Sequence, residues 1–223
     1  MAVVVTCASF VGLHAADAHT LNAAGRARLV PASTTPLEAA RSLPPVTHWR
    51  GQSSEHALLS EAVFEYSKWL GFPRRVGVAC WSEGDWRSVA GSGEHHILLG
   101  FWTPAQPRRL HLSPRVCRSL QALMSSRPRY ADATSANALD TVAHEMLHAM
   151  GYRNEAQTEC YAMQTADVVG HHLGVPRAYL KGLSRLFLVA NSRRSSEYQD
   201  PIRCSEGGVW DLDPAHASAP WHP

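Results

Sequence analysis

Apolar residues recur at three- and four-residue spacings near the middle of the chain, which predicts an amphipathic helix. The apolar stripe consists of Leu139, Val142, Ala143, Met146, Leu147 and Met150. The opposite side carries Asn137, Asp140, Thr141, His144 and His148. Thr134 or Ser135 is a suitable N-cap, and Gly151 is a suitable helix stop.

A second helix is expected directly after this one, from about Asn154 to His172. Asn154 is a good N-cap, and the helix dipole favours Glu155 in a first turn. The connection between the two helices is short, so we expect them to pack antiparallel as a hairpin.

The remaining elements follow from local patterns and turn residues. We expect a helix from Ser54 to Leu70 that ends at Gly71, and a helix that begins at Ser113-Pro114 and runs through about Met124. Pro176 opens a last helix to about Asn191. Three strands are expected, at Arg75 to Trp81, His96 to Trp102 and Arg109 to Leu112. A helix, a small three-stranded sheet and then packed helices make an α+β fold.

Length and charge limit the function classes. The 223 residues suffice for one well-buried core. The net charge of +2 gives no reason to expect nucleic acid or an anionic membrane as a partner. No apolar run approaches the roughly 20 residues that a membrane span needs.

The N-terminal stretch favours an exported protein. Residues 2–13 are mostly apolar, and Ala16-Asp17-Ala18 resembles a signal-peptidase site, although no Lys or Arg precedes the apolar residues. We therefore expect a signal peptide at 1–18 and a secreted or extracytoplasmic location. The alternative is a cytoplasmic protein whose first strand lies here. Residues 19–50 have the composition of a linker or pro-segment, 51–204 form the domain, and 205–223 form a C-terminal tail.

Removal of a signal peptide would also remove Cys7 and leave four cysteines. An even number suits two disulfides in an oxidising compartment, and four cysteines allow three connectivities. We prefer Cys80 with Cys117 and Cys160 with Cys204, because each pair closes a loop of about forty residues. The alternative is free, buried thiols in a cytosolic protein.

The chemistry-bearing motif is His144-Glu145-Met146-Leu147-His148. Two histidines four apart on a helix lie one turn apart on one face, where both can reach a single zinc ion. Glu145 then faces the open position of the metal, where it can take a proton from a metal-activated water. The alternative is a pair of helix-surface histidines with a nearby glutamate in a salt bridge.

A third zinc ligand is available on the second helix. Catalytic zinc sites usually have three protein ligands, so two histidines alone are insufficient. Pairing across the predicted hairpin places Glu155 opposite His148 and Glu159 opposite His144. The two glutamates are four apart and share one face.

This arrangement resembles the gluzincins, zinc metallopeptidases in which a Glu-x-x-x-Asp motif follows the His-Glu-x-x-His helix. The resemblance covers about twenty residues. The chain most resembles a small, secreted bacterial member of this group. It implies a minimal zincin-like domain in which Glu155 is the third ligand and Glu159 orients His144. The spacer is much shorter than in thermolysin, and Glu replaces Asp at 159, so a swap with Glu159 as ligand stays open. The metzincin pattern matches as far as Gly151 and fails at Asn154.

The resemblance implies zinc-dependent hydrolysis of peptide bonds in a peptide or protein substrate. A strand at 96–102 or 109–112 would be the edge strand that pairs with extended substrate. Two other classes remain: a zinc-containing binding or structural domain without activity, and a metal-free domain. Candidate donors to an oxyanion are Tyr152, Tyr161 and His172. The adjacent pairs His95-His96 and His171-His172 do not resemble chelates, because neighbouring side chains point in different directions.

Overall fold

The computed structural model describes residues 20–21, 27–28, 53–90, 98–125 and 131–215. The predicted signal peptide and His95-His96 lie outside the described residues, as does most of the predicted linker. The elements are β1 (Thr20–Leu21), β2 (Ala27–Arg28), β3 (Ser53–Glu55), α2 (Ala57–Trp69), β4 (Gly77–Trp81), α3 (Glu83–Ala90), β5 (Gly100–Trp102), β6 (Arg109–Leu112), α4 (Pro114–Ser125), α5 (Ala133–Met150), α6 (Glu155–His172), α7 (Arg177–Asn191) and the 3-10 helix η1 (Ser196–Tyr198). The protein therefore has the predicted α+β fold.

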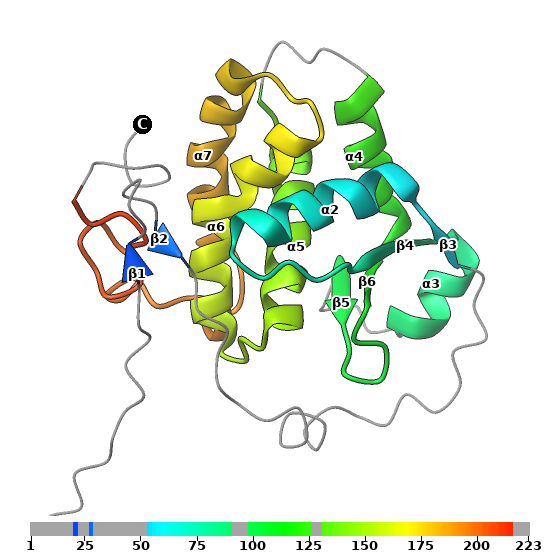
Figure 1. Ribbon diagram of the computed structural model, residues 1–223, viewed down its shortest axis with the longest axis horizontal. Coiled ribbons are helices and arrows are strands. Elements are labelled where there is room, and N and C mark those ends of the chain that lie inside the picture. The colour runs from blue at the N-terminus through cyan, green and yellow to red at the C-terminus, as the bar shows by residue number, and fades with distance from the viewer. Residues whose placement is uncertain (1–19, 22–26, 29–52, 91–97, 126–130, 216–223) are drawn as a thin grey trace, which may run out of the picture.

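A four-stranded sheet with the order β3-β4-β6-β5 lies on one side of α5, and α6 and α7 lie on the other (Figure 1). β4 and β6 are parallel, with Gly77 paired to Arg109, and the two outer pairings are antiparallel. The three predicted strands are confirmed in type, and β3 joins them as a fourth. β6 lies inside the sheet, so it cannot be the edge strand beside the site; β5 takes that position.

The predicted helix start at Ser54 is wrong. Ser54 pairs with Cys80 in the β3–β4 ladder, so its backbone is extended. The helix begins at Ala57, after His56, whose imidazole accepts a hydrogen bond from the amide of Leu59 at 3.4 Å. A histidine is an unusual N-cap, and the usual Ser preference pointed to the wrong residue.

The start of α5 also differs from the prediction. Its N-cap is Asp132, which accepts hydrogen bonds from both the amide and the hydroxyl of Ser135, at 2.9 and 2.7 Å. The predicted end is confirmed, because Gly151 has a φ of 109° that L side chains rarely adopt. Asn154 caps α6 through Gln157, and the bounds of α6 match the prediction.

α5 is the centre of the molecule and is buried on nearly all sides. Its apolar stripe packs in the core, as predicted. The polar side is buried as well: Asp140 is 2% exposed, His144 5% and Glu145 7%. The surface-histidine alternative is therefore wrong for His144. A charged or hydrogen-bonding side chain is buried at a cost unless it has partners, so this flank of α5 must be paired.

β5 lies directly against α5 and runs in the same direction. A Cβ atom on Gly100 would lie 2.8 Å from Cγ2 of Thr141, so only glycine fits at this contact. Two residues further along, the backbone of Trp102 is hydrogen-bonded to Glu145, one turn further along α5.

Both predicted disulfides are present. Cys80–Cys117 joins β4 to α4, and Cys160–Cys204 joins α6 to the segment after η1. Trp210 and Leu212, beyond the predicted domain end at residue 204, are buried in the core. None of the helices in the described part of the chain has the length and apolar character that a membrane span requires.

Candidate metal centre

The α5–α6 hairpin brings three predicted ligands to one point. Among the described residues, His144, His148 and Glu155 form a group whose ligand atoms all lie within 4.8 Å of one another. Glu155 Oε2 is 3.1 Å from His144 Nε2 and 3.3 Å from His148 Nε2. The four-residue connection after α5 places the first turn of α6 beside the last turns of α5, which makes this convergence possible.

These separations fit a tetrahedral zinc site. Zinc binds imidazole nitrogen and carboxylate oxygen at about 2.0–2.2 Å, so two ligand atoms of a tetrahedron lie about 3.3 Å apart. The distances from Glu155 Oε2 to the two imidazole nitrogens are close to that value. His/His/Glu is also a donor set found in catalytic zinc sites.

The second nitrogen of each imidazole is held by an acceptor. His144 Nδ1 lies 3.0 Å from Glu159 Oε2, and His148 Nδ1 lies 2.9 Å from the carbonyl oxygen of Tyr152. A carbonyl only accepts, so His148 Nδ1 carries the proton, and in the neutral ring Nε2 presents a lone pair. When both rings are neutral, the lone pairs of the two Nε2 atoms face the carboxylate of Glu155. A cation placed between these three groups removes their mutual repulsion.

The pKa values of His144 and Glu155 also indicate that positive charge is stabilised at this point. Burial lowers the pKa of His144, but hydrogen bonds with Glu155 and Glu159 and the charge of Glu145 raise it overall to about 10. Burial raises the pKa of Glu155, but hydrogen bonds with both histidines and their charges lower it well below its usual range. The cluster therefore takes up a proton when it holds no metal, and a divalent cation would replace that proton.

Glu145 is placed beside this point and not within it. Its side chain is buried, and burial raises the pKa of its carboxyl, partly offset by the charges of His144 and His148 and a hydrogen bond with the backbone of Trp102. Glu145 and His144 line the same groove. A buried carboxylate with a raised pKa at the edge of a cleft suits a group that takes and returns a proton.

Glu159 lies on the far side of His144 and is held by a charge network. Arg194 binds Glu159 Oε1 through Nε at 3.0 Å and Asp140 Oδ2 through Nη2 at 2.6 Å. Burial raises the pKa of Glu159, but the hydrogen bond with His144 and the charge of Arg194 lower it overall. Burial and the neighbouring Glu159 raise the pKa of Asp140 to about 8. The guanidinium of Arg194 thus stabilises negative charge on this pair of carboxyls.

Sequence reasoning missed three residues of this site: Asp140, Arg194 and Tyr198. The ring of Tyr198 lies 5.8 Å from that of His144, and Arg194 lies over the Tyr198 ring at 5.5 Å. Asp140 could have been found, because it stands four residues before His144 on the same flank. Arg194 and Tyr198 follow the last helix, and no sequence period connects them to the motif.

The predicted oxyanion donors lie elsewhere. Tyr152 and Tyr161 are buried and contact each other edge to face at 5.4 Å. His172 lies at the opposite end of α6 from Glu155, about 25 Å away along the helix, and its ring contacts that of His171 at 5.5 Å. None of the three lines the groove at the metal centre.

The groove at the centre has a volume of about 680 Å³. One wall is formed by Gly100 of β5 and the two residues before it, and the other wall by α7 and residues 193–198. The floor is the flank of α5 that carries Asn137, Thr141 and His144. It reaches His144 and Glu145 at one end, and its size suits a small molecule or several residues of a peptide.

Comparison of the chain with protein-family models, with curated proteins and with solved structures finds no match.

Proposed function

We propose that the protein is a zinc metallopeptidase of the gluzincin type. The observation that carries the proposal is the convergence of His144, His148 and Glu155 beside the buried Glu145, with Glu155 Oε2 at tetrahedral separations from the Nε2 atoms of both histidines. It is the ligand set and the general base that the motif predicts. The two disulfides are compatible with an extracytoplasmic location, and we propose that the protein is exported.

In this proposal His144, His148 and Glu155 hold the zinc, and Glu159 fixes the tautomer and orientation of His144 through Nδ1. The zinc ion, when bound, supplies a Lewis acid that polarises a carbonyl and makes water more acidic. Glu145 accepts the proton of the attacking water at its carboxylate and passes it to the leaving amine.

Tyr198 replaces the earlier candidates as the donor to the developing oxyanion. It lines the groove with His144 and Glu145. Burial and the charges of Glu155, Glu197 and Glu145 raise its pKa to about 12, so its hydroxyl keeps its proton at neutral pH and can donate. A positioned donor of this kind contributes on the order of a hundredfold or more to a rate.

The substrate in this proposal is an extended peptide that pairs with β5. β5 is the edge of the described sheet and forms a wall of the groove beside Glu145. An edge strand offers backbone hydrogen bonds to any sequence, with pockets to either side for alternate side chains.

The test joins metal content to hydrolysis. Purified protein should contain one zinc per chain by elemental analysis, and it should degrade unfolded casein in a reaction that a chelator abolishes and zinc restores. Glu145→Gln should keep the zinc and lose at least about a thousandfold in rate. Glu61→Gln, an exposed carboxylate on α2, is the matched control and should retain full activity.

Three results would contradict the proposal. Zinc without any hydrolysis would indicate a binding or structural domain, and full activity of the Glu145→Gln protein would remove that residue from the mechanism. Absence of zinc together with unaltered stability in chelator would leave a metal-free domain.

A further inference from the structure

The three elements that line the groove, β5, α5 and α7, run in the same direction, toward the metal centre. Gly100 of β5 lies against Thr141, and the next turn of α5 meets Trp102, so β5 and α5 run the same way. At the start of α7, Tyr179 donates to Asp132 at 3.0 Å, and beyond its end Arg194 binds Asp140. α7 therefore also runs along α5, from the N-terminal end of α5 toward the metal centre.

The groove is long enough for several substrate residues on one side of the cleaved bond. It extends along α5 from Ala133 to Glu145, a distance of about 18 Å at 1.5 Å per residue. An extended peptide spans that distance with about five residues. The walls beside it are mostly apolar, with Leu98 and Leu99 on one side and Leu186 and Val189 on the other.

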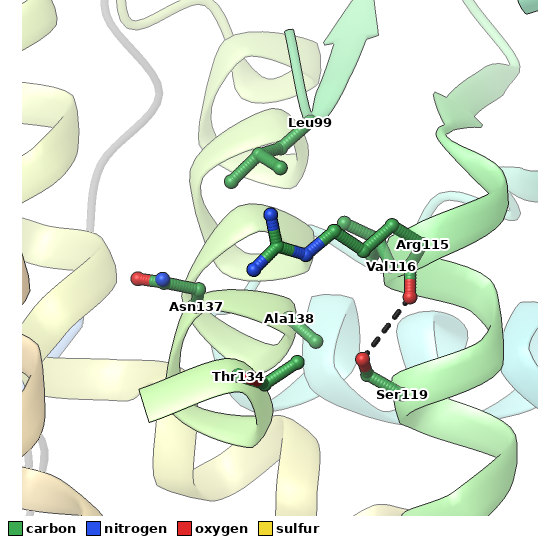
Figure 2. Close-up of a pocket in the computed structure, with 7 residues that line it drawn as sticks. All are labelled: Leu99, Arg115, Val116, Ser119, Thr134, Asn137 and Ala138. Atoms are coloured by element: carbon green, nitrogen blue, oxygen red, sulfur yellow. Dashed lines mark hydrogen bonds between the residues drawn. The ribbon is translucent and has the colours of Figure 1, made fainter. Parts of the chain in front are cut away.

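A smaller cavity of about 140 Å³ adjoins the end of the groove that is remote from the metal. It shares Leu99 and Asn137 with the groove. Figure 2 shows the guanidinium of Arg115 reaching from α4 toward α5, between Leu99 and the turn that carries Thr134, Asn137 and Ala138. Arg115 is the one charged side chain among the described residues that line this cavity.

The positive charge of Arg115 is unbalanced within the described part of the chain. No described carboxylate lies within ion-pair distance of Arg115, whereas Arg118 on the same helix binds Glu83 at 2.7 Å. At the metal end of the groove both arginines lie among carboxylates, because Arg194 binds Asp140 and Glu159, and Arg193 lines the groove together with Glu197. The remote end is thus the part of the groove that favours an anion.

We infer that Arg115 binds a carboxylate of the peptide substrate, three or four residues to the C-terminal side of the cleaved bond; this rests on the proposed function. Asn137 lies eight residues before Glu145, or about 12 Å along α5, which an extended chain spans with three to four residues. Antiparallel pairing with an edge strand is the more stable arrangement. Because β5 runs toward the metal centre, a chain antiparallel to it runs away from the centre and places its C-terminal part at Arg115.

The chemistry of the cavity suits a carboxylate in particular. A guanidinium offers paired N–H donors that match the two oxygens of a carboxylate. The hydroxyl of Thr134 and the amide of Asn137 lie on the same turn of the lining and can donate as well. The carboxylate can come from an acidic side chain or from the C-terminus of a short peptide.

The test uses quenched fluorescent peptides that differ at one position. Glu at the third or fourth residue after the cleaved bond is compared with Gln, and a peptide that ends there with a free carboxylate is compared with its amide. The carboxylate should raise kcat/KM about tenfold, and Arg115→Gln should remove that gain while it leaves the neutral peptides unchanged. Arg118→Gln, which removes an equal charge from the same helix, should keep the gain. High salt should reduce it.

The two arms separate the sources of the carboxylate. A gain in the side-chain pair indicates selection for acidic residues, and a gain confined to the free terminus indicates recognition of a peptide end. Either result supports Arg115 when the gain is lost in Arg115→Gln. Three outcomes would overturn the inference. The gain in kcat/KM could be equal in Arg115→Gln, or it could be absent from both pairs of peptides. It could also depend on Arg115 only for carboxylates before the cleaved bond.

A binding measurement keeps this test separate from the proposed function. Fluorescence anisotropy with Glu145→Gln protein, which leaves the peptide intact, should give a Kd about tenfold lower for the carboxylate peptide than for its neutral partner. The difference should vanish when Arg115→Gln is added. Binding that depends on Arg115 without any hydrolysis by the parent would refute the peptidase and keep the carboxylate site, whereas hydrolysis without that dependence would do the reverse.

Discussion

Two glutamates four residues apart perform different tasks in the proposed centre. Glu155 faces the Nε2 atoms of both histidines. Of the two histidines, Glu159 contacts His144, through Nδ1. Glu159→Gln should weaken zinc binding about 10- to 100-fold, as the loss of a carboxylate behind a ligating histidine usually does. Glu155→Gln should weaken it further, because it removes a ligand.

Competition with a zinc-sensitive dye measures both affinities, and Glu197→Gln, at the mouth of the groove, serves as control. The opposite order of the two effects would establish the swap in which Glu159 is the ligand.

His111 makes folding sensitive to acid. Its ring is 1% exposed, stacks on Phe101 at 4.5 Å and lies 3.1 Å from the indole nitrogen of Trp81, which donates to Nδ1. Burial, with a smaller contribution from Arg109, lowers the pKa of His111 from 6.5 to about 4. The folded state therefore binds fewer protons than the unfolded chain between these values, and stability falls as the pH drops from about 6.5 to 4.

The loss attributable to His111 should reach at most about 3 kcal/mol. Urea unfolding of wild type and His111→Gln at pH 7.5 and pH 4.5 measures it. The variant should lose less stability over this range, and equal losses in both proteins would remove His111 as the cause.

The candidate ligands could be found from sequence because helical spacing determines them locally. His144 and His148 share a face through the four-residue period, and the short connection after Gly151 leaves Glu155 and Glu159 little choice but to face them. Arg194 and Tyr198 could not be found this way. Their position depends on how α7 packs along α5, and neither helix periodicity nor turn chemistry specifies the packing of distant elements.

At the level of elements, a disulfide ties the segment after α7 to the site, in addition to the ion pairs of Arg194. This segment carries Arg194 and Tyr198, η1 contacts α6, and Cys204 then bonds Cys160, the neighbour of Glu159. The bridge Cys80–Cys117 lies on the sheet side of the molecule, away from these residues.

Removal of either bridge by a double Cys→Ser substitution should cost up to about 4 kcal/mol, because the two bridges close loops of similar length, with sequence separations of 37 and 44. Only the Cys160/Cys204 variant should also lose zinc affinity, since it releases the segment that holds Glu159 in place. Thermal unfolding and dye competition measure the two effects. Equal zinc affinities in both variants would show that packing alone positions Arg194.

Elements with strong local signals were predicted well, and elements without such signals were missed. α5 has periodic apolar positions, the Asn154 side chain caps α6, α7 begins after Pro176, and β6 matches its predicted bounds. α3 was missed because Glu83–Ala90 has few apolar residues, and its packing depends on the contacts of Trp86 with the distant Trp81 and Phe101 rings. β3 was missed because Ser53–Glu55 has no apolar pattern, and its strand exists through pairing with β4.

For the molecule as a whole, the metal would act as a clamp between α5 and α6, the most extensively packed pair of helices. An ion that binds only the folded state stabilises it by about 4 kcal/mol when free zinc is a thousand times the Kd. A chelator should therefore lower Tm by several degrees, and zinc should restore it. Differential scanning calorimetry checks this, with His148→Gln as a protein that should no longer respond. An unchanged Tm in chelator would contradict a resident metal.

The bare backbone at Gly100 allows the sheet to lie directly against the side chain of Thr141 on α5. A Cβ atom at this position would push β5 away from α5. The backbone amide of Trp102 would then move away from the carboxyl of Glu145, to which it is hydrogen-bonded. In the proposed enzyme, the absence of a Cβ atom at Gly100 therefore governs both the width of the cleft and the basicity of Glu145.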